Sequence, residues 1–189
     1  MKKIALVLAL VLAMSAFAGC GNNAAETTEP TNETTTAPTT EPGVTAPEGT
    51  AAELIDMIYE QVTVELGLMT ETTEGALADG ERFTNLTTIE SMDGIVDAAV
   101  SMPAMGAQAY HLVMVRAESA EKAAELAQHM FDNMDMARWV CVQATEKQAV
   151  VCGDLAFFVM LAPQYGVTTD QIVEGFTTVC GGAVDTVIK

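Results

Sequence analysis

The feature that most restricts the fold is a change in composition near residue 50. Residues 21–50 consist almost only of Thr, Pro, Glu, Ala, Asn and Gly, and Val44 is their single large apolar residue. Such a segment cannot bury enough apolar surface to offset the entropy lost on ordering it. Residues 51–189 are rich in apolar residues and have a length typical of one domain. The sequence therefore predicts a disordered tether over residues 20–50 and a single domain over residues 51–189.

The first twenty residues have the pattern of a bacterial lipoprotein signal. Lys2 and Lys3 precede an apolar run that ends at Phe17, and two small residues, Ala18 and Gly19, stand before Cys20. The run is shorter than the roughly 20 apolar residues that a membrane-spanning helix needs. We expect residues 1–19 to be a signal peptide and Cys20 to carry a lipid that anchors the chain to the outer face of the cell membrane. An ordinary secretory signal is the alternative.

The charge balance narrows the range of partners. The chain has 26 acidic and 8 basic residues, a net charge of −18. The signal peptide holds two of the basic residues and none of the acidic ones, so the remainder carries −20. This field repels nucleic acids and anionic lipid headgroups. Nucleic-acid binding is therefore excluded as a function, while a protein, a peptide, a metal ion or a neutral ligand stays open as a partner.

Hydrophobic periodicity predicts three amphipathic helices, over residues 51–66, 119–136 and 168–180. Ser119 and Thr168 are suitable N-caps, and Gln171 completes a capping box with Thr168. Strands are expected over residues 107–116, 139–143, 148–152 and 155–161, and the last is apolar on both faces. The expected fold is α+β: an antiparallel sheet of about four strands covered by helices, in the order α-β-α-β-β-β-α.

Several short motifs within residues 51–189 resemble a family of small bacterial lipoproteins that is known only as a domain of unknown function, DUF4358. The motifs are Met102-Pro-Ala-Met105 before the strand Ala109–Val113, Asn133-Met-Asp135 followed by Arg138-Trp-Val-Cys141, and Val150-Val-Cys-Gly-Asp-Leu155. The resemblance covers nearly the whole predicted domain. It implies an α+β fold outside the cytoplasm, and it implies no particular activity, cofactor or site.

Cys141 and Cys152 are candidate disulfide partners. If Glu146 and Lys147 form a two-residue turn, the two cysteines oppose each other in neighbouring antiparallel strands, with Cα atoms about 4.5–5.5 Å apart. A disulfide spans that distance. A shift of one residue in the turn would put one cysteine on the other face, so two buried thiols are the alternative. Cys180 falls on the apolar side of the last predicted helix and is expected to be a core thiol.

A metal or redox protein is the alternative function, with Cys141, Cys152, His129 and Met136 as its residues. Thioether and imidazole groups suit Cu(I). However, Met130 and Met134 fall on the apolar stripe of the same predicted helix, where methionine fills gaps in the core. The sequence contains no hydrolase, phosphate-loop or dinucleotide-binding motif. We therefore expect no catalytic residues, no resident metal and no cofactor.

The first expectation is a non-enzymatic binding module that is tethered to the membrane and contacts an unidentified protein or peptide. The loop of Met102, Pro103, Met105 and Gly106 places apolar residues beside a proline and a glycine between two elements. This loop is the candidate contact surface, and a connection packed under the sheet is the alternative.

Overall fold

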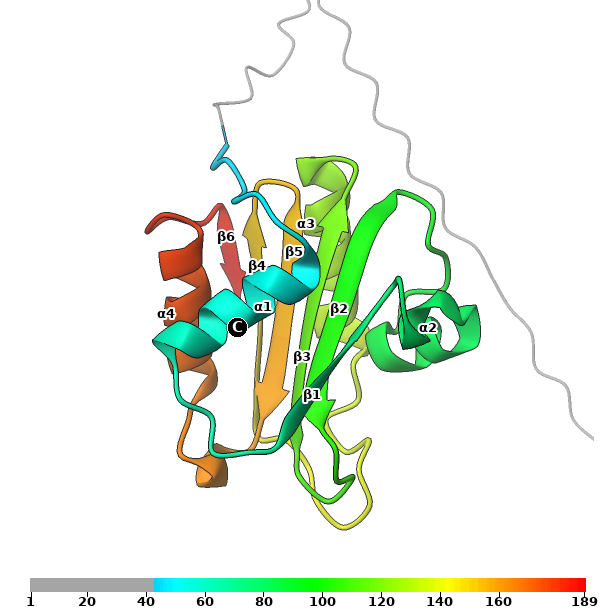
Figure 1. Cartoon of the computed structure of the whole chain (residues 1–189), viewed down its shortest axis with the longest axis vertical. Coiled ribbons are helices and arrows are strands. Elements are labelled where there is room, and N and C mark those ends of the chain that lie inside the picture. The colour runs from blue at the N-terminus through cyan, green and yellow to red at the C-terminus, as the bar shows by residue number, and fades with distance from the viewer. Residues whose placement is uncertain (1–42) are drawn as a thin grey trace, which may run out of the picture. The chain divides into compact units, whose positions relative to one another are not determined.

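The computed structural model describes residues 43–189, which form an open antiparallel sheet of six strands with helices on both faces (Figure 1). In chain order the elements are α1 (Ala51–Gln61), β1 (Leu68–Thr72), η1 (Ala76–Ala78), α2 (Gly80–Thr87), β2 (Ile95–Pro103), β3 (Tyr110–Ala117), α3 (Ala120–Asn133), β4 (Glu146–Cys152), β5 (Leu155–Leu161), η2 (Pro163–Tyr165), α4 (Thr169–Val179) and β6 (Thr186–Ile188). The strand order is β1-β2-β3-β5-β4-β6. The expected α+β class is confirmed, with six strands in place of about four. The order of helices and strands is α-β-α-β-β-α-β-β-α-β in place of the expected α-β-α-β-β-β-α. The predicted signal peptide and the predicted lipid attachment site, Cys20, lie outside the described residues.

The helices begin where their capping residues stand. Ser119 caps α3 by accepting from Lys122 N, and Thr168 forms a capping box with Gln171 at the start of α4. Both starts were expected from the sequence. A second capping box, between Thr50 and Glu53, begins α1. None of the helices in residues 43–189 has both the length and the apolar character needed to cross a membrane.

The sheet separates two hydrophobic cores because its central strands are apolar on both faces. All seven residues of β5 are buried, as expected for an interior strand. On one face α1 and α4 pack against side chains that include Leu112, Phe157 and Val159. On the other face α2 and α3 pack against side chains that include Val113, Phe158 and Met160. Alternate residues of one strand thus serve different cores.

The expected strand over residues 139–143 is wrong. These residues form an irregular loop between α3 and β4, and Ala144 N donates to Met136 O at 2.8 Å to close it. Cys141 has φ = 67°, a left-handed conformation that an extended strand does not contain. The half-buried Trp139 packs against the core on the α3 side. The apolar run Trp-Val-Cys-Val thus belongs to a loop that is anchored by its aromatic residue.

Three strands were not among the four expected. β2 occupies the apolar stretch that begins at Ile95, and β1 and β6 lie at the two edges of the sheet. β1 has the sequence Leu-Met-Thr-Glu-Thr, and β6 has only three residues. Short and polar edge strands have little hydrophobic pattern, because one side of an edge strand is not covered by a neighbour.

Residues 43–49 belong to the folded domain, although the sequence predicted a tether that extends to residue 50. Val44 and Ala46 pack against the core on the α1 side. Arg116 Nη2 donates to Pro47 O at 2.7 Å and to Gly49 O at 3.1 Å, which fixes the last residues of the segment. The sparse apolar side chains of this segment are sufficient here because the domain supplies the surface that they cover.

Candidate functional site

The β2–β3 loop exposes one large apolar side chain at its tip. The side chain of Met105 is 65% exposed, and the neighbouring Gly106 is also exposed. Of the other two residues in the expected contact loop, Pro103 is buried and Met102 packs against the core on the α3 side. The loop is therefore divided: its first residues are packed, in line with the alternative interpretation, and its tip projects into solvent.

A second loop projects from the same end of the sheet. It joins α3 to β4 and carries Val140, which is 79% exposed. The register places the two loops together, because Tyr110 at the start of β3 and Glu146 at the start of β4 both pair with Leu161 of β5. Met105 and Val140 are the two most exposed large apolar residues in the described part of the chain.

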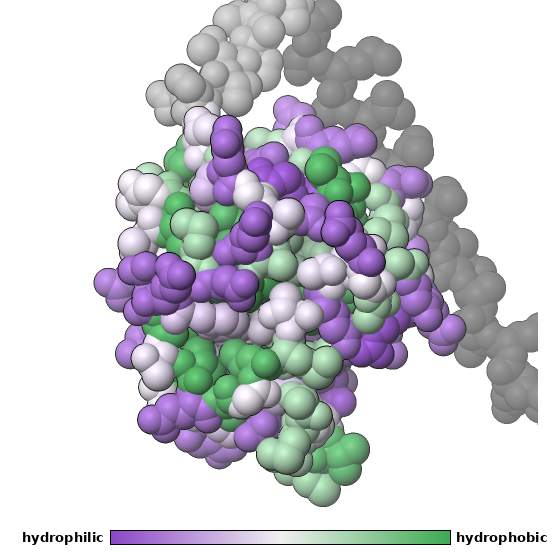
Figure 2. All heavy atoms as spheres, viewed as in Figure 1, coloured by the Kyte–Doolittle hydropathy of each residue, from purple (hydrophilic) through white to green (hydrophobic). Residues whose placement is uncertain are grey.

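The surface formed by these two loop tips, residues 104–107 and 139–143, is uncharged; we call it the apolar tip. Neither segment contains Asp, Glu, Lys, Arg or His, although the chain as a whole carries a net charge of −18. Figure 2 shows green and pale green spheres gathered on a lobe at the lower end of the domain, where both loops lie in Figure 1. An exposed apolar area of this kind is typical of a contact surface.

The chain enters the domain at the opposite end of the sheet. Asp185 holds residues 43–46 there, because its Oδ1 accepts from Val44 N at 2.8 Å and its Oδ2 accepts from Gly153 N at 2.6 Å. Gly153 lies in the β4–β5 turn with φ = 55°, and a Cβ at this position would come within 2.7 Å of Ala46 N. The apolar tip and residues 43–46 consequently lie at opposite ends of the sheet (Figure 1).

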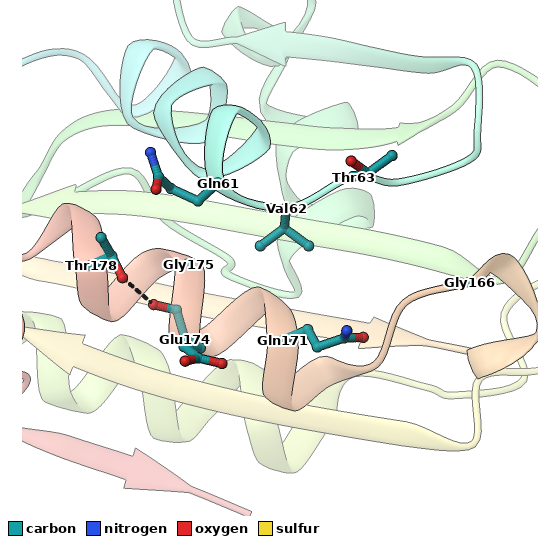
Figure 3. Close-up of a pocket in the computed structure, with 8 residues that line it drawn as sticks. All are labelled: Gln61, Val62, Thr63, Gly166, Gln171, Glu174, Gly175 and Thr178. Atoms are coloured by element: carbon teal, nitrogen blue, oxygen red, sulfur yellow. Dashed lines mark hydrogen bonds between the residues drawn. The ribbon is translucent and has the colours of Figure 1, made fainter.

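A groove of about 450 Å³ lies between the end of α1 and one side of α4 (Figure 3). Its lining is mainly polar and includes Gln61, Gln171 and Glu174. Gly175 forms the floor of the helix crossing, where a Cβ would lie 2.8 Å from Val62 Cγ2 and 3.4 Å from Ile58 Cγ2. The groove thus follows from a close approach of two helices that only glycine permits, and no convergent set of reactive groups lines it.

Replacing Gly175 by valine is expected to destabilise the domain by about 2 kcal/mol, because the added methyl groups force α1 and α4 apart. Glu174→Val is the matched control, since it introduces the same side chain at an exposed position one residue earlier in α4. Urea unfolding followed by circular dichroism gives both free energies. Equal losses in the two variants would show that valine is unfavourable anywhere in this helix and that the crossing itself is not tight.

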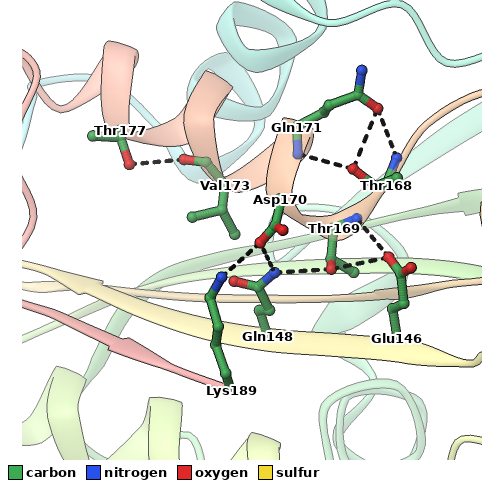
Figure 4. A network of polar contacts seen from close by, with 9 residues as sticks. All are labelled: Glu146, Gln148, Thr168, Thr169, Asp170, Gln171, Val173, Thr177 and Lys189. Carbon is green, nitrogen blue, oxygen red and sulfur yellow. Dashed lines mark hydrogen bonds and ion pairs between the residues drawn. The ribbon is translucent and has the colours of Figure 1, made fainter.

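A polar network joins the start of α4 to β4 (Figure 4). Gln148, which is buried, donates through Nε2 to Thr169 Oγ1 at 2.9 Å and to Asp170 Oδ1 at 2.6 Å. Glu146 Oε2 accepts from Thr169 N at 3.1 Å, and Lys189 Nζ pairs with Asp170 Oδ1 at 2.7 Å. These groups satisfy one another, apart from Gln148 Oε1. The network serves to fix the start of α4 against the sheet.

His111 is a buried histidine on the α3 side of β3. Its Nε2–H donates to Leu86 O at 2.7 Å, and Arg138 Nη1 lies 3.4 Å from the same nitrogen. Burial and the positive charge of Arg138 lower the pKa of His111 from 6.5 to about 3. The imidazole is therefore neutral at physiological pH, and its one exchangeable proton is used in a structural hydrogen bond.

The structure does not bring the proposed metal or redox residues together. Cys152 is buried in the core on the α1 side, whereas Met136 packs against the core on the other side of the sheet. Cys141 is exposed on the loop between α3 and β4, and His129 Nε2 bonds to Thr88 O at 2.8 Å. Within residues 43–189, no three His, Cys, Asp or Glu side chains are grouped so that they could share a metal ion.

The expected pairing of Cys141 with Cys152 relied on the strand that is absent. Cys152 pairs with Leu155 in the β4–β5 hairpin, and Cys141 lies outside the sheet. Cys141, Cys152 and Cys180 are all free thiols in the structure. Cys180 is buried at the end of α4, which confirms its position in the core.

The exposed Val140 was missed as a candidate contact residue because it was assigned to a strand. The available signal was the run 139–145, which contains no charged residue in a strongly acidic chain.

Comparison of the chain with protein-family models, with curated proteins and with solved structures finds no match. The resemblance to DUF4358 therefore stays a prediction, and the function has to be argued from the residues of this chain.

Proposed function

We propose that this chain is a membrane-anchored, non-enzymatic binding module on the outer face of the cell membrane, and that it binds an apolar surface of a partner protein through the apolar tip. The observation that carries the proposal is the position of Met105 and Val140, which are 65% and 79% exposed on two separate loops at one end of the sheet. Burying two such side chains in a partner would contribute roughly 1.5–3 kcal/mol for each.

The choice of a protein partner follows from the charge of the apolar tip and from the position of residues 43–46 on the domain. The lack of charged residues on the apolar tip favours an apolar partner surface over a charged ligand. The tip lies at the opposite end of the sheet from residues 43–46, through which the chain connects to Cys20. The tip therefore lies clear of the point where the predicted tether joins the domain, and another protein can reach it there.

Anchoring is tested by replacing Cys20 with alanine in the full chain. We expect the variant to leave the membrane fraction and to appear in the soluble fraction outside the cytoplasm, because a lipid cannot be attached without the cysteine thiol. Cys141→Ala is the control, since this exposed cysteine plays no part in the proposed anchoring. A Cys20→Ala protein that sediments with membranes as fully as the control would contradict lipid anchoring.

Binding is tested by site-specific photocrosslinking on intact cells. A photoreactive phenylalanine analogue replaces Met105, Val140 or, as the matched control, Val96, which is 62% exposed on β2 outside the apolar tip. We expect one common protein adduct from positions 105 and 140 and none from position 96. Adding Val140→Asp to the protein with the probe at 105 should weaken that adduct about tenfold or more, because a charge would enter an apolar contact.

Three results would contradict the proposed contact. Adducts with lipid from positions 105 and 140 would assign the tip to the membrane surface. Equal protein adducts from all three positions would indicate collision without a defined site. An absence of adducts at both loop positions, in cells where the anchored protein is present at its normal level, would show that the tip is not a contact surface.

A further inference from the structure

Three segments converge at the end of the sheet where the chain enters the domain. Cys152 is the last residue of β4, and Cys180 is the C-cap of α4. The segment after Cys180 returns along β4, where Asp185 N donates to Val151 O at 2.8 Å and Asp185 Oδ2 accepts from Gly153 N at 2.6 Å. The residues on both sides of Cys152 are thus bonded to the segment that follows Cys180.

Cys152 and Cys180 are buried in the same hydrophobic core. Cys152 is fully buried and Cys180 is 7% exposed, and both belong to the core that the sheet forms with α1 and α4. Cys141, the only other cysteine among the described residues, is exposed on the loop at the far end of the sheet. Neither thiol of the buried pair takes part in the apolar tip or in the polar network at the start of α4.

Each of the two thiols also shifts the pKa of the other. The hydrogen bond with the Cys180 thiol lowers the pKa of Cys152, and the same contact together with burial raises the pKa of Cys180. Cys152 is therefore the thiol of the pair that loses its proton first. The thiolate is the form of cysteine that attacks a disulfide.

We propose that Cys152 and Cys180 form a disulfide bond that joins the end of β4 to the end of α4. The oxidant is a disulfide, through thiol–disulfide exchange. One thiolate of the pair attacks a sulfur of the oxidant and releases one thiolate from it, and the second cysteine then attacks the cysteine sulfur of the mixed disulfide and releases the other. Two electrons pass to the oxidant, and the protons of the two cysteines go to its two released thiolates.

The bridge would stabilise the end of the domain where residues 43–46 lie. It would close a loop of about 29 residues, and the entropy removed from the unfolded chain corresponds to a rise in Tm of about 10 °C. An oxidising location, which is part of the proposed function, would keep the bond formed. The experiment on the isolated chain does not depend on that location.

Tryptic mapping of the full chain tests the pairing directly. No Lys or Arg lies between Lys147 and Lys189, so residues 148–189 form one peptide that contains both Cys152 and Cys180, while Cys141 lies in the peptide 139–147. The protein is incubated with oxidised glutathione, unfolded, treated with an alkylating reagent and digested without reduction. We expect the peptide 148–189 to be lighter than its reduced form by two hydrogen atoms and to carry no alkyl group.

Either of two results would overturn the pairing. One is a peptide 148–189 in which Cys152 or Cys180 carries an alkyl group or a single glutathione, and the other is a covalent link between the peptides 148–189 and 139–147.

Thermal unfolding supplies an independent measurement. A reductant should lower the Tm of the oxidised wild type and of Cys141→Ser by about 10 °C and leave the Tm of Cys180→Ser unchanged. An equal Tm for oxidised and reduced wild-type protein would contradict the stabilising role.

Discussion

Lowering the pH from 7 to about 4.5 is expected to destabilise the domain by about 3 kcal/mol through His111 alone. The pKa of this histidine is lowered from 6.5 to about 3, first by burial and then by the charge of Arg138. In the unfolded chain the imidazole binds a proton at about pH 6.5, whereas in the folded domain it stays neutral until the pH approaches 3. The stabilisation is therefore complete above about pH 6.5 and is lost progressively as the pH falls toward 3.

His111→Gln separates this effect from the titration of the many carboxylates. The glutamine amide can donate to Leu86 O as the imidazole does, but it does not titrate. We expect the free energy of unfolding of the wild type to fall more steeply than that of the variant between pH 6.5 and 4.5, by about 1.4 kcal/mol per pH unit. Urea unfolding at several pH values measures both slopes. Parallel slopes would mean that His111 is protonated in the folded domain or reaches solvent in it.

The central part of the fold could be predicted because its strands have a strong two-sided apolar pattern. β3 and β5 are buried throughout their middle, and only interior strands contain runs such as Leu155–Leu161. The starts of α3 and α4 could be predicted because Ser119 and Thr168 accept the backbone hydrogen bonds that each helix leaves open. These features are local, and the sequence carries them without tertiary information.

The errors occurred where tertiary packing decides the local structure. Trp139 begins a short apolar run of the kind found in strands. In the structure it is anchored in the α3-side core, and Cys141 takes a left-handed backbone conformation. Residues 43–49 have the composition of the predicted tether. Hydrogen bonds with Arg116 and Asp185, far along the chain, and the packing of Val44 and Ala46 hold them on the domain. The hydrophobic pattern of either segment gives no sign of these contacts, because the residues that form them lie far away in the sequence.

The candidate site was predictable only in part, for a related reason. Met105 could be named because Pro103 and Gly106 mark a loop, whereas Val140 required knowledge that its segment is not a strand. The location of Cys152 and Cys180 in one core, at one end of the sheet, depends on how the end of α4 docks beside β4. Counting residues outward from an assumed turn suggests Cys141 as the partner of Cys152. Such a count pairs residues within a hairpin, and it gives no information on where a helix docks.

One aromatic pair joins α4 to the sheet. Phe157 of β5 and Phe176 of α4 are fully buried, and their rings stack with centroids 4.5 Å apart and an interplanar angle of 9°. Phe157→Ala is expected to destabilise the domain by about 4 kcal/mol, because it removes the apolar contact and leaves a cavity that the sheet cannot close. Urea unfolding monitored by circular dichroism gives this value.

A double-mutant cycle separates the stacking from the burial. Phe157→Leu, which retains much of the apolar volume, should cost less than half as much as Phe157→Ala. Combining Phe157→Ala with Phe176→Ala should destabilise the domain by about 1 kcal/mol less than the sum of the two single variants, because the first substitution has already removed the ring contact. Strict additivity would show that the rings are buried side by side without a specific interaction. In that case α4 would be held mainly by the close approach at Gly175 and by the polar network around Gln148.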